Sequence, residues 1–151
     1  MERTMKSDLT IKLARVRRTV WARHASPWSA WSRWATTPLV LLPVWTRRWP
    51  HAAATTAWFA LNPVVFPEPP DDRAWSTRAI LGEEQWIADR PKDLALVVNA
   101  SAAAASVVAV AAAYRRRPVA AASATGAQMA LTLVYWELMT RYLGRRQRSA
   151  R

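Results

Sequence analysis

The side chains best suited to chemistry in this sequence form one candidate polar cluster. Two adjacent carboxylates, Glu83 and Glu84, follow a cation, Arg78, and carboxylates beside a cation can serve acid–base chemistry or bind a metal ion. Upstream, His24 stands beside an arginine and can hold a phosphate. The alternative is that all these groups form a solvated face or structural hydrogen bonds. The full candidate cluster is Arg23, His24, Asn62, Arg78, Glu83 and Glu84.

The residue types exclude several classes of chemistry. The 151 residues, enough for one domain, contain no cysteine, which excludes a disulfide framework, an iron–sulfur cluster, a thiolate zinc site and a cysteine nucleophile. With only two histidines, His24 and His51, a histidine-rich metal site is not expected either. The sequence therefore predicts no metal and no cofactor, and it assigns no catalytic residue.

The net charge of +12 predicts an anionic partner. Basic residues gather in blocks, with eight Lys or Arg in residues 1–33 and five in residues 141–151, and uncharged stretches separate the blocks. No helix-turn-helix, zinc-finger or aromatic-sheet signature of a nucleic-acid-binding domain is present. We therefore expect anionic membrane lipid, and no nucleic acid, as the partner.

Two uncharged stretches in the second half are long enough to cross a membrane. Residues 94–114 and 119–136 carry no charge, and a helix needs about 20 apolar residues to cross a hydrocarbon core of roughly 30 Å. Both are rich in alanine, so insertion of either alone is marginal, and a pair of soluble helices is the alternative. Ala122, Gly126 and Ala130, spaced four apart, predict a close contact between the two helices.

Two shorter uncharged stretches, 34–46 and 49–67, predict a first hairpin of membrane helices. The first can span only if it extends back through Trp28 and Trp31 with Arg33 reaching the headgroups. The sequence thus predicts an all-α integral membrane protein with about four transmembrane helices in two hairpins. A single membrane domain, 27–143, holds helices at about 28–46, 50–66, 94–114 and 119–143 and a cytoplasmic segment, 67–93, between the hairpins.

The distribution of Lys and Arg predicts the orientation, because acidic residues contribute little to topology. With four crossings, the N-terminus, the segment 67–93 and the C-terminus share one side and hold 17 basic residues, against 5 on the other. This count predicts a multi-pass protein of the cell membrane with both termini in the cytoplasm. The triplet Arg115-Arg116-Arg117 on the outer side stands against it, so an odd number of crossings stays open.

Both termini are predicted to be basic extensions of the membrane domain. Residues 1–26 form an arm in which apolar residues recur at helical spacing between Leu9 and Val20, as in a basic amphipathic helix lying on an anionic leaflet. Residues 144–151 form a basic tail. The predicted contacts with anionic lipid are Arg15, Arg17 and Arg18.

Aromatic residues are expected at the membrane surface. Three tryptophans spaced three apart predict an interface belt, with the rings in the apolar layer and the N–H groups among the headgroups. They are Trp28, Trp31 and Trp34. A short amphipathic helix in the segment 67–93 is expected to face the membrane through Ile80, Trp86 and Ile87.

Several local motifs occur in an order that resembles a known family of small tryptophan-rich prokaryotic membrane proteins, catalogued as a domain of unknown function, 6653. The resemblance covers roughly residues 21–90 and implies several membrane helices, with no established activity and no catalytic residues. The motifs are Ala22 to Ser29, Trp31-Ser32-Arg33, Leu61-Asn62-Pro63, Phe66-Pro67-Glu68-Pro69, and Trp75 to Trp86 with Leu81-Gly82-Glu83.

Three functions are compatible with these patterns. The first is a non-enzymatic membrane component that contacts anionic lipid or partner helices in a homo- or hetero-oligomer. The second is a small transporter or channel subunit whose path is lined by Asn62, Asn99 and Gln128. The third is a membrane enzyme that uses Arg78, Glu83 and Glu84 beside His24 at the cytoplasmic surface. Convergence of the candidate polar side chains favours a site, whereas dispersal favours structural roles.

Overall fold

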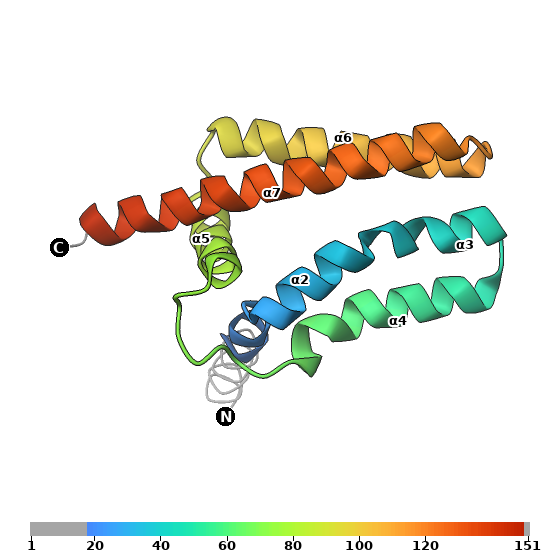
Figure 1. The fold of residues 1–151 in the computed structure, drawn as a ribbon. Coiled ribbons are helices and arrows are strands. Elements are labelled where there is room, and N and C mark those ends of the chain that lie inside the picture. Colours follow the sequence, from blue (N-terminus) through green and yellow to red (C-terminus); the bar gives the residue numbers. More distant parts are fainter. Residues whose placement is uncertain (1–17, 150–151) are drawn as a thin grey trace, which may run out of the picture.

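The computed structural model describes residues 18–149, and every regular element within them is a helix, which confirms the predicted all-α class (Figure 1). Residues 18–24 are helical, and the rest of the predicted arm, Arg15 and Arg17 included, lies outside the described residues. The helices are α2 (Pro27–Thr36), the 3-10 helix η1 (Thr37–Val40), α3 (Leu41–Thr46), α4 (Trp49–Val65), α5 (Trp75–Asp89), α6 (Leu94–Tyr114) and α7 (Pro118–Ser149).

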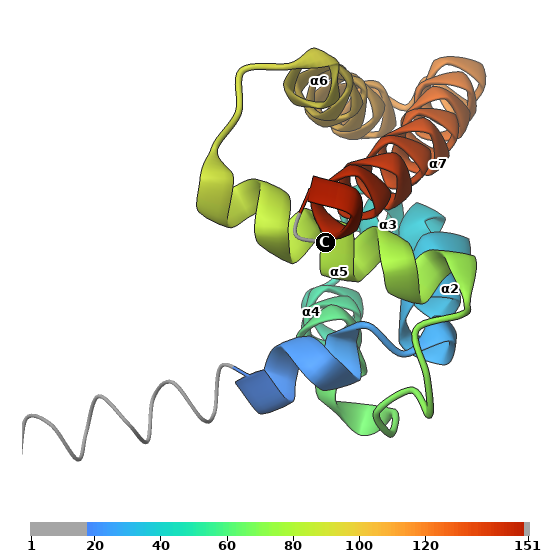
Figure 2. The same cartoon turned by 90° about the vertical axis from the view of Figure 1, so that its left-hand side faces the viewer.

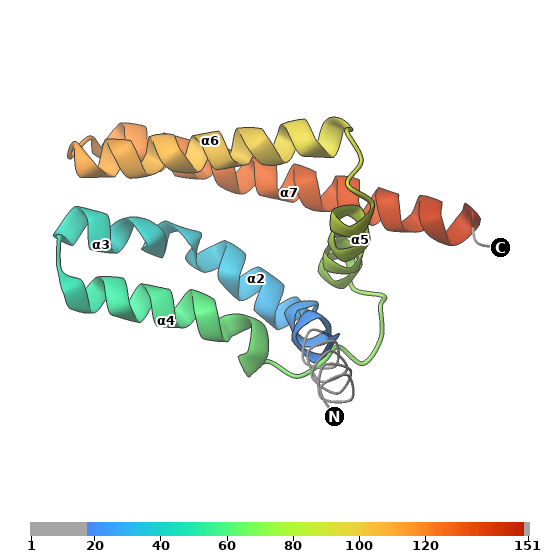
Figure 3. The ribbon, with the colours of Figure 1, turned by 180° about the vertical axis from the view of Figure 1, so that it is seen from behind.

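The helices form two antiparallel pairs and one crossing helix. The α2–η1–α3 rod pairs with α4, α6 pairs with α7, and the two pairs lie one above the other (Figures 1 and 3). Helix α5 connects the pairs and runs across one end of the bundle, as the end-on view shows (Figure 2). The described chain begins and ends on the α5 side, and both tight turns lie at the opposite end (Figure 1).

Local sequence explains where the helices begin and end. Proline occupies the first turn of both α2 and α4, where its missing N–H costs nothing. Asp93 caps α6 by accepting hydrogen bonds from the backbone N–H groups of Ala95 and Leu96. Helix α3 ends at Arg47, whose φ of 52° lies in the left-handed region. The helices expected at 50–66 and 94–114 lie within one residue of α4 and α6, whereas the one expected at 28–46 is divided into α2, η1 and α3, and α7 extends further than expected.

The contact between α6 and α7 does not use the predicted stripe of small residues. Helix α6 buries alanines at positions 95, 102 and 109, and α7 meets it near Ala121 and Thr125. A Cβ on Gly126 would touch nothing within 4 Å, and its two neighbours in the predicted stripe are exposed. The prediction was wrong by one residue because Trp136 and Met139 share the helical face of Ala121 and Thr125, and their burial fixes the rotation of α7.

The main core lies where α5 crosses α7. A Cβ built on Gly82 would stand 2.1 Å from the carbonyl oxygen of Met139, so only glycine allows this approach of the two backbones. Ile80 and Trp86 are 2% and 8% exposed in this core, while Ile87 is exposed. The expectation that these three residues face a membrane was therefore wrong for two of them, because α5 turns its apolar side toward α7.

Among the described helices, α6 alone is long and apolar enough to cross a membrane by the usual criteria. Its most apolar stretch of 18 residues has a mean hydropathy of 2.1, and 22% of that stretch is buried inside the protein. A core helix of a water-soluble protein passes the same test, but such a helix is mostly buried. The exposed apolar residues of α6 include Leu94, Leu96, Val97, Val107, Val108 and Val110.

Candidate functional site

The largest group of interacting polar side chains lies at the α5 end, and we call it the polar junction. It comprises His24, Ser29, Arg33, Asn62, Glu83 and Tyr135, together with the neighbouring Ser32. Five helical segments contribute to it, because α2 is flanked here by residues 18–24, α4, α5 and α7. The junction therefore depends on the fold as a whole and not on one local motif.

Arg33 and His24 form one half of the polar junction. Nη1 of Arg33 lies 2.8 Å from Nδ1 and 3.1 Å from Nε2 of His24, while Nε of Arg33 donates to the carbonyl oxygen of Ser29 at 3.1 Å. Burial, reinforced by the charge of Arg33, lowers the pKa of His24 from 6.5 to about 4. His24 is therefore neutral near pH 7, and its unprotonated ring nitrogen accepts the hydrogen bond from Arg33.

Glu83 and Tyr135 form the other half of the polar junction. The hydroxyl of Tyr135 donates to Oε1 of Glu83 at 3.1 Å, and the charge of Arg33 is close enough to act on the same carboxyl group. Burial raises the pKa of Glu83, while the Tyr135 hydrogen bond and the Arg33 charge oppose that rise. Glu83 is thus a carboxyl group held between a cation and a phenol, in a setting that favours uptake of a proton.

Asn62 joins α4 to α2 at the edge of the polar junction. It is fully buried; its Oδ1 accepts from the hydroxyl of Ser29 at 3.0 Å, and its Nδ2 donates to the hydroxyl of Ser32 at 2.8 Å. Ser29 also links this pair to Arg33 through its carbonyl oxygen. These contacts satisfy both ends of the amide, which is the arrangement expected of a structural hydrogen-bond network.

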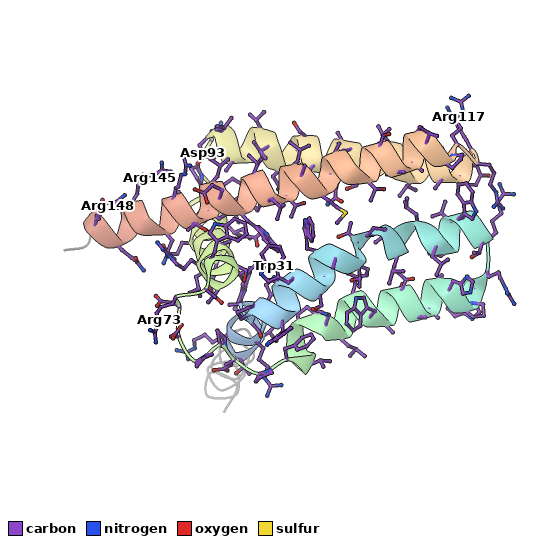
Figure 4. The ribbon with its side chains drawn as sticks, in the orientation of Figure 1. Trp31, Arg73, Asp93, Arg117, Arg145 and Arg148 are labelled. Atoms are coloured by element: carbon purple, nitrogen blue, oxygen red, sulfur yellow. The ribbon has the colours of Figure 1, made fainter. Side chains whose placement is uncertain are left out.

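Tryptophans pack beside the polar junction. Trp31 points toward the crossing of α5 and α7 (Figure 4), where its ring centroid lies 5.9 Å from that of Trp75 and 5.7 Å from that of Trp136. Trp34 donates its indole N–H to the carbonyl oxygen of Met129 on α7. Of the three tryptophans predicted to form a belt, Trp28 is 73% exposed, whereas the other two tie α2 to the rest of the core.

The structure brings together three of the six candidate residues and leaves three outside the polar junction. His24, Asn62 and Glu83 belong to it. Arg23 is exposed and donates to the carbonyl oxygen of Val64, two residues after Asn62. Arg78 turns toward α7, and Glu84 makes no side-chain hydrogen bond or ion pair within residues 18–149. The adjacent pair Glu83–Glu84 therefore does not act as a unit, because the two side chains leave α5 in different directions.

Four members of the polar junction were not predicted: Ser29, Ser32, Arg33 and Tyr135. Arg33 was expected to reach lipid headgroups, because the stretch 34–46 can span a membrane only if it extends back past this residue. The serines at positions 29 and 32 are one helical turn apart, which was the available signal that they share a partner. No sequence signal distinguished Tyr135 from the apolar residues around it.

The polar junction contains groups that can hold or move a proton. It contains a neutral imidazole, a carboxyl group with a raised pKa and a guanidinium group, but the described residues hold no group of three or more His, Asp or Glu that could bind a metal. Two large apolar hollows, of about 840 and 640 Å³, lie instead beside α3 at the opposite end. Of the predicted lipid contacts, Arg18 is described and exposed.

Comparison with known proteins gives one match. A family model described as "Family of unknown function (DUF6653)" matches residues 7–129, which is most of the chain and includes every residue of the polar junction except Tyr135. No curated protein and no solved structure matches the chain.

Proposed function

The chain belongs to this family of unknown function, and from that premise we propose that it is a multi-pass integral membrane protein that acts without catalysis, by contacting anionic lipid and partner helices. The observation that carries the proposal is α6, whose 21 residues hold no charge and whose apolar face is left uncovered. In water, an uncovered apolar surface of this kind is unfavourable, whereas in lipid it is the expected surface.

The arrangement of the helices supports a crossing geometry. At about 1.5 Å per residue, α6 is about 31 Å long, close to the thickness of a hydrocarbon core. The α2–η1–α3 rod, α4 and α7 run alongside it, and α5 lies across one end, as an interfacial helix would (Figures 1 and 2). Because the segment 67–93 and both ends of the described chain share the α5 side, the count of basic residues favours that side as cytoplasmic.

The turns at the opposite end have the composition of a membrane interface. The guanidinium group of Arg47 lies 5.1 Å from the ring centroid of Tyr114, and that of Arg116 lies 5.3 Å from the ring of Trp45. Both arginines adopt left-handed backbone conformations, with φ of 52° and 58°, which glycine would adopt with less strain. Cations and aromatic rings at such positions suit the headgroup layer.

A transport path receives less support from the three amides that it would need. Asn62 is fully buried and bonded to α2, Asn99 is exposed on α6, and Gln128 donates to Thr132 on its own helix. These amides lie on three different helices without a shared cavity among those lined by described residues. They fit structural roles better than a common route through the bundle.

Carbonate extraction combined with reporter fusions after residues 50, 80, 117 and 151 tests the proposal. We expect the chain to stay in the membrane pellet, with the reporters at 80 and 151 in the cytoplasm and those at 50 and 117 outside. Release by carbonate, or recovery of the purified chain as a monodisperse detergent-free solution, would contradict the proposal.

A lysine in α6 separates lipid from water as the surrounding solvent. Val107 is 69% exposed, so in a membrane Val107→Lys costs about 2.5–3.5 kcal/mol of insertion and lowers the inserted fraction. In water the same change would raise solubility instead. Val119→Lys is the matched control, because Val119 is 78% exposed but lies beside Arg117 at the interface.

A further inference from the structure

A second polar feature, separate from the polar junction, lies between α5 and the last turns of α7. Four arginines line a hollow of about 340 Å³, together with Thr140 and Gly144. Arg78 comes from α5, and Arg145 and Arg148 lie on the part of α7 that projects past α5 (Figure 4). We call this hollow the arginine cleft; its four arginines are Arg78, Arg141, Arg145 and Arg148.

The arginine cleft holds more positive charge than the protein itself neutralises. Arg141 forms an ion pair with Glu137 at 2.7 Å, and the guanidinium group of Arg145 lies over the ring of Tyr142 at 5.9 Å. Glu137 also acts on Arg78 through charge, but the guanidinium groups of Arg78, Arg145 and Arg148 have no hydrogen-bond acceptor or ion-pair partner within residues 18–149. Other arginines at this end are paired: Arg146, on the next face of α7, bonds to Asp89 at 2.8 Å.

Gly144 leaves space between two of these cations. A Cβ on Gly144 would lie 3.8 Å from Nη2 of Arg78 and 4.0 Å from Nη1 of Arg148, so the two guanidinium groups approach one point from different helices. An anion placed between the two guanidinium groups would offset the repulsion of their like charges. Arginines in the last turn of α7 interact favourably with the helix dipole. That interaction does not explain the position of Arg78, which belongs to α5.

We propose that the arginine cleft binds the phosphate group of a phosphomonoester. A phosphomonoester carries a charge of about −1.5 to −2 near neutral pH and presents three terminal oxygens, and arginine donates to phosphate through a planar pair of N–H groups. Three guanidinium groups without an ion-pair partner around one hollow match that charge and that number of acceptors better than they match a single carboxylate, which would neutralise only one of them.

The phosphate has two sources in this setting, a lipid headgroup or a soluble phosphate ester. At about 1.5 Å per residue, Arg141 lies about 35 Å along α7 from Pro118, just past the thickness of a hydrocarbon core. The cleft would then lie at the headgroups on the α5 side. The lipid source rests on the proposed membrane function, whereas phosphate binding as such does not.

The test uses the full-length chain in detergent with two probes. Glycerol 3-phosphate is titrated by calorimetry, and retention of phosphatidic acid from phosphatidylcholine nanodiscs is measured by native mass spectrometry. The charge variant R78Q/R145Q is expected to weaken binding about tenfold or more, because it removes two charge-assisted contacts. Gly144→Leu keeps all four arginines, favours the helix and fills the cleft, so it is expected to weaken binding to a similar extent.

The matched control is R115Q/R117Q, which removes the same charge from exposed residues of the opposite turn and is expected to change binding by less than about twofold. Binding of either probe with this pattern supports the cleft, and the probe retained identifies the source. Absence of binding for both probes, or equal weakening by the control pair, overturns the proposal. If carbonate releases the chain, the glycerol 3-phosphate titration still tests the cleft in detergent-free buffer, so the two failures are distinguishable.

Discussion

The α5 end and the turn end of the bundle are held together by different kinds of contact. At the α5 end, where α5 crosses α7, large side chains such as Ile80, Trp136 and Met139 are buried, and hydrogen bonds join polar groups from five helical segments. At the turn end, which comprises the turns at 47–48 and 115–117, a small cluster of alanines packs against partly exposed residues of α3. Large apolar hollows lie beside that cluster.

This difference indicates which end of the bundle fixes the arrangement of the helices and which end leaves apolar surface open. Interlocking aromatic side chains and buried hydrogen bonds fix one arrangement of helices, because each unmatched group costs free energy. Alanine faces pack closely but bury little area, so under the proposed function we expect contacts with lipid or another helix to stabilise the turn end. The following changes test this contrast.

The largest effect is expected for Gly82→Ala at the α5 end. The new Cβ would stand 2.1 Å from a backbone oxygen of α7, so the helices must separate, and we expect a loss of about 3 kcal/mol in the free energy of unfolding. Gly126→Ala is the control, because its Cβ meets nothing within 4 Å and alanine favours the helix by up to about 1 kcal/mol. Thermal unfolding followed by circular dichroism measures both changes, and equal midpoints would contradict the close contact.

The second largest effect is expected for Asn62→Ala. The change removes a fully buried amide, so the hydroxyls of Ser29 and Ser32 each lose one hydrogen bond and keep one to a backbone carbonyl oxygen, at a cost of about 1–3 kcal/mol. Asn99→Ala, on the exposed face of α6, is expected to change stability by less than about 0.5 kcal/mol. If both substitutions lower the free energy of unfolding by the same amount, the hydrogen-bond network around Asn62 contributes no specific stability.

The same contrast explains how far the sequence could predict the structure. Helix positions followed from charge-free stretches, prolines and the Asp93 cap, because these signals act within a few residues. The rotation of α7 could not be predicted, since it depends on the burial of Trp136 and Met139 against a helix fifty residues earlier. Helical periodicity alone allowed either of two neighbouring small-residue stripes.

The candidate site was predicted in part for the same reason. His24, Asn62 and Glu83 stood out as polar residues near apolar stretches, and the fold brings them to one end. Arg33 and Tyr135 acquire their roles only through tertiary contacts, which leave no local spacing to detect. The orientation of Arg78 away from the cluster likewise depends on where α7 passes.

A smaller effect is expected from the acid titration of His24. Because burial and the Arg33 charge lower its pKa from 6.5 to about 4, the folded state binds fewer protons than the unfolded state between these values. Its contribution to stability is complete above pH 6.5 and is lost as the pH falls toward 4. We expect the stability difference between wild type and His24→Gln to shrink by about 1–2 kcal/mol over that interval, since partial exposure weakens the effect. The raised pKa of Glu83 acts in the opposite direction in both proteins, so the difference isolates His24.

The smallest effect is expected when arginines with a left-handed backbone conformation are replaced by glycine, one at each end of the bundle. Arg90 ends α5 with a φ of 50° and has no side-chain partner within residues 18–149, so Arg90→Gly relieves backbone strain and is expected to stabilise the fold by up to about 1 kcal/mol. Arg47 has a similar φ, but its guanidinium group lies over Tyr114 and donates to the carbonyl oxygen of that residue at 3.5 Å. Arg47→Gly loses that contact, so we expect a change near zero. Equal gains for the two variants, measured as unfolding midpoints in one detergent, would mean that the contact between Arg47 and Tyr114 does not stabilise the turn end.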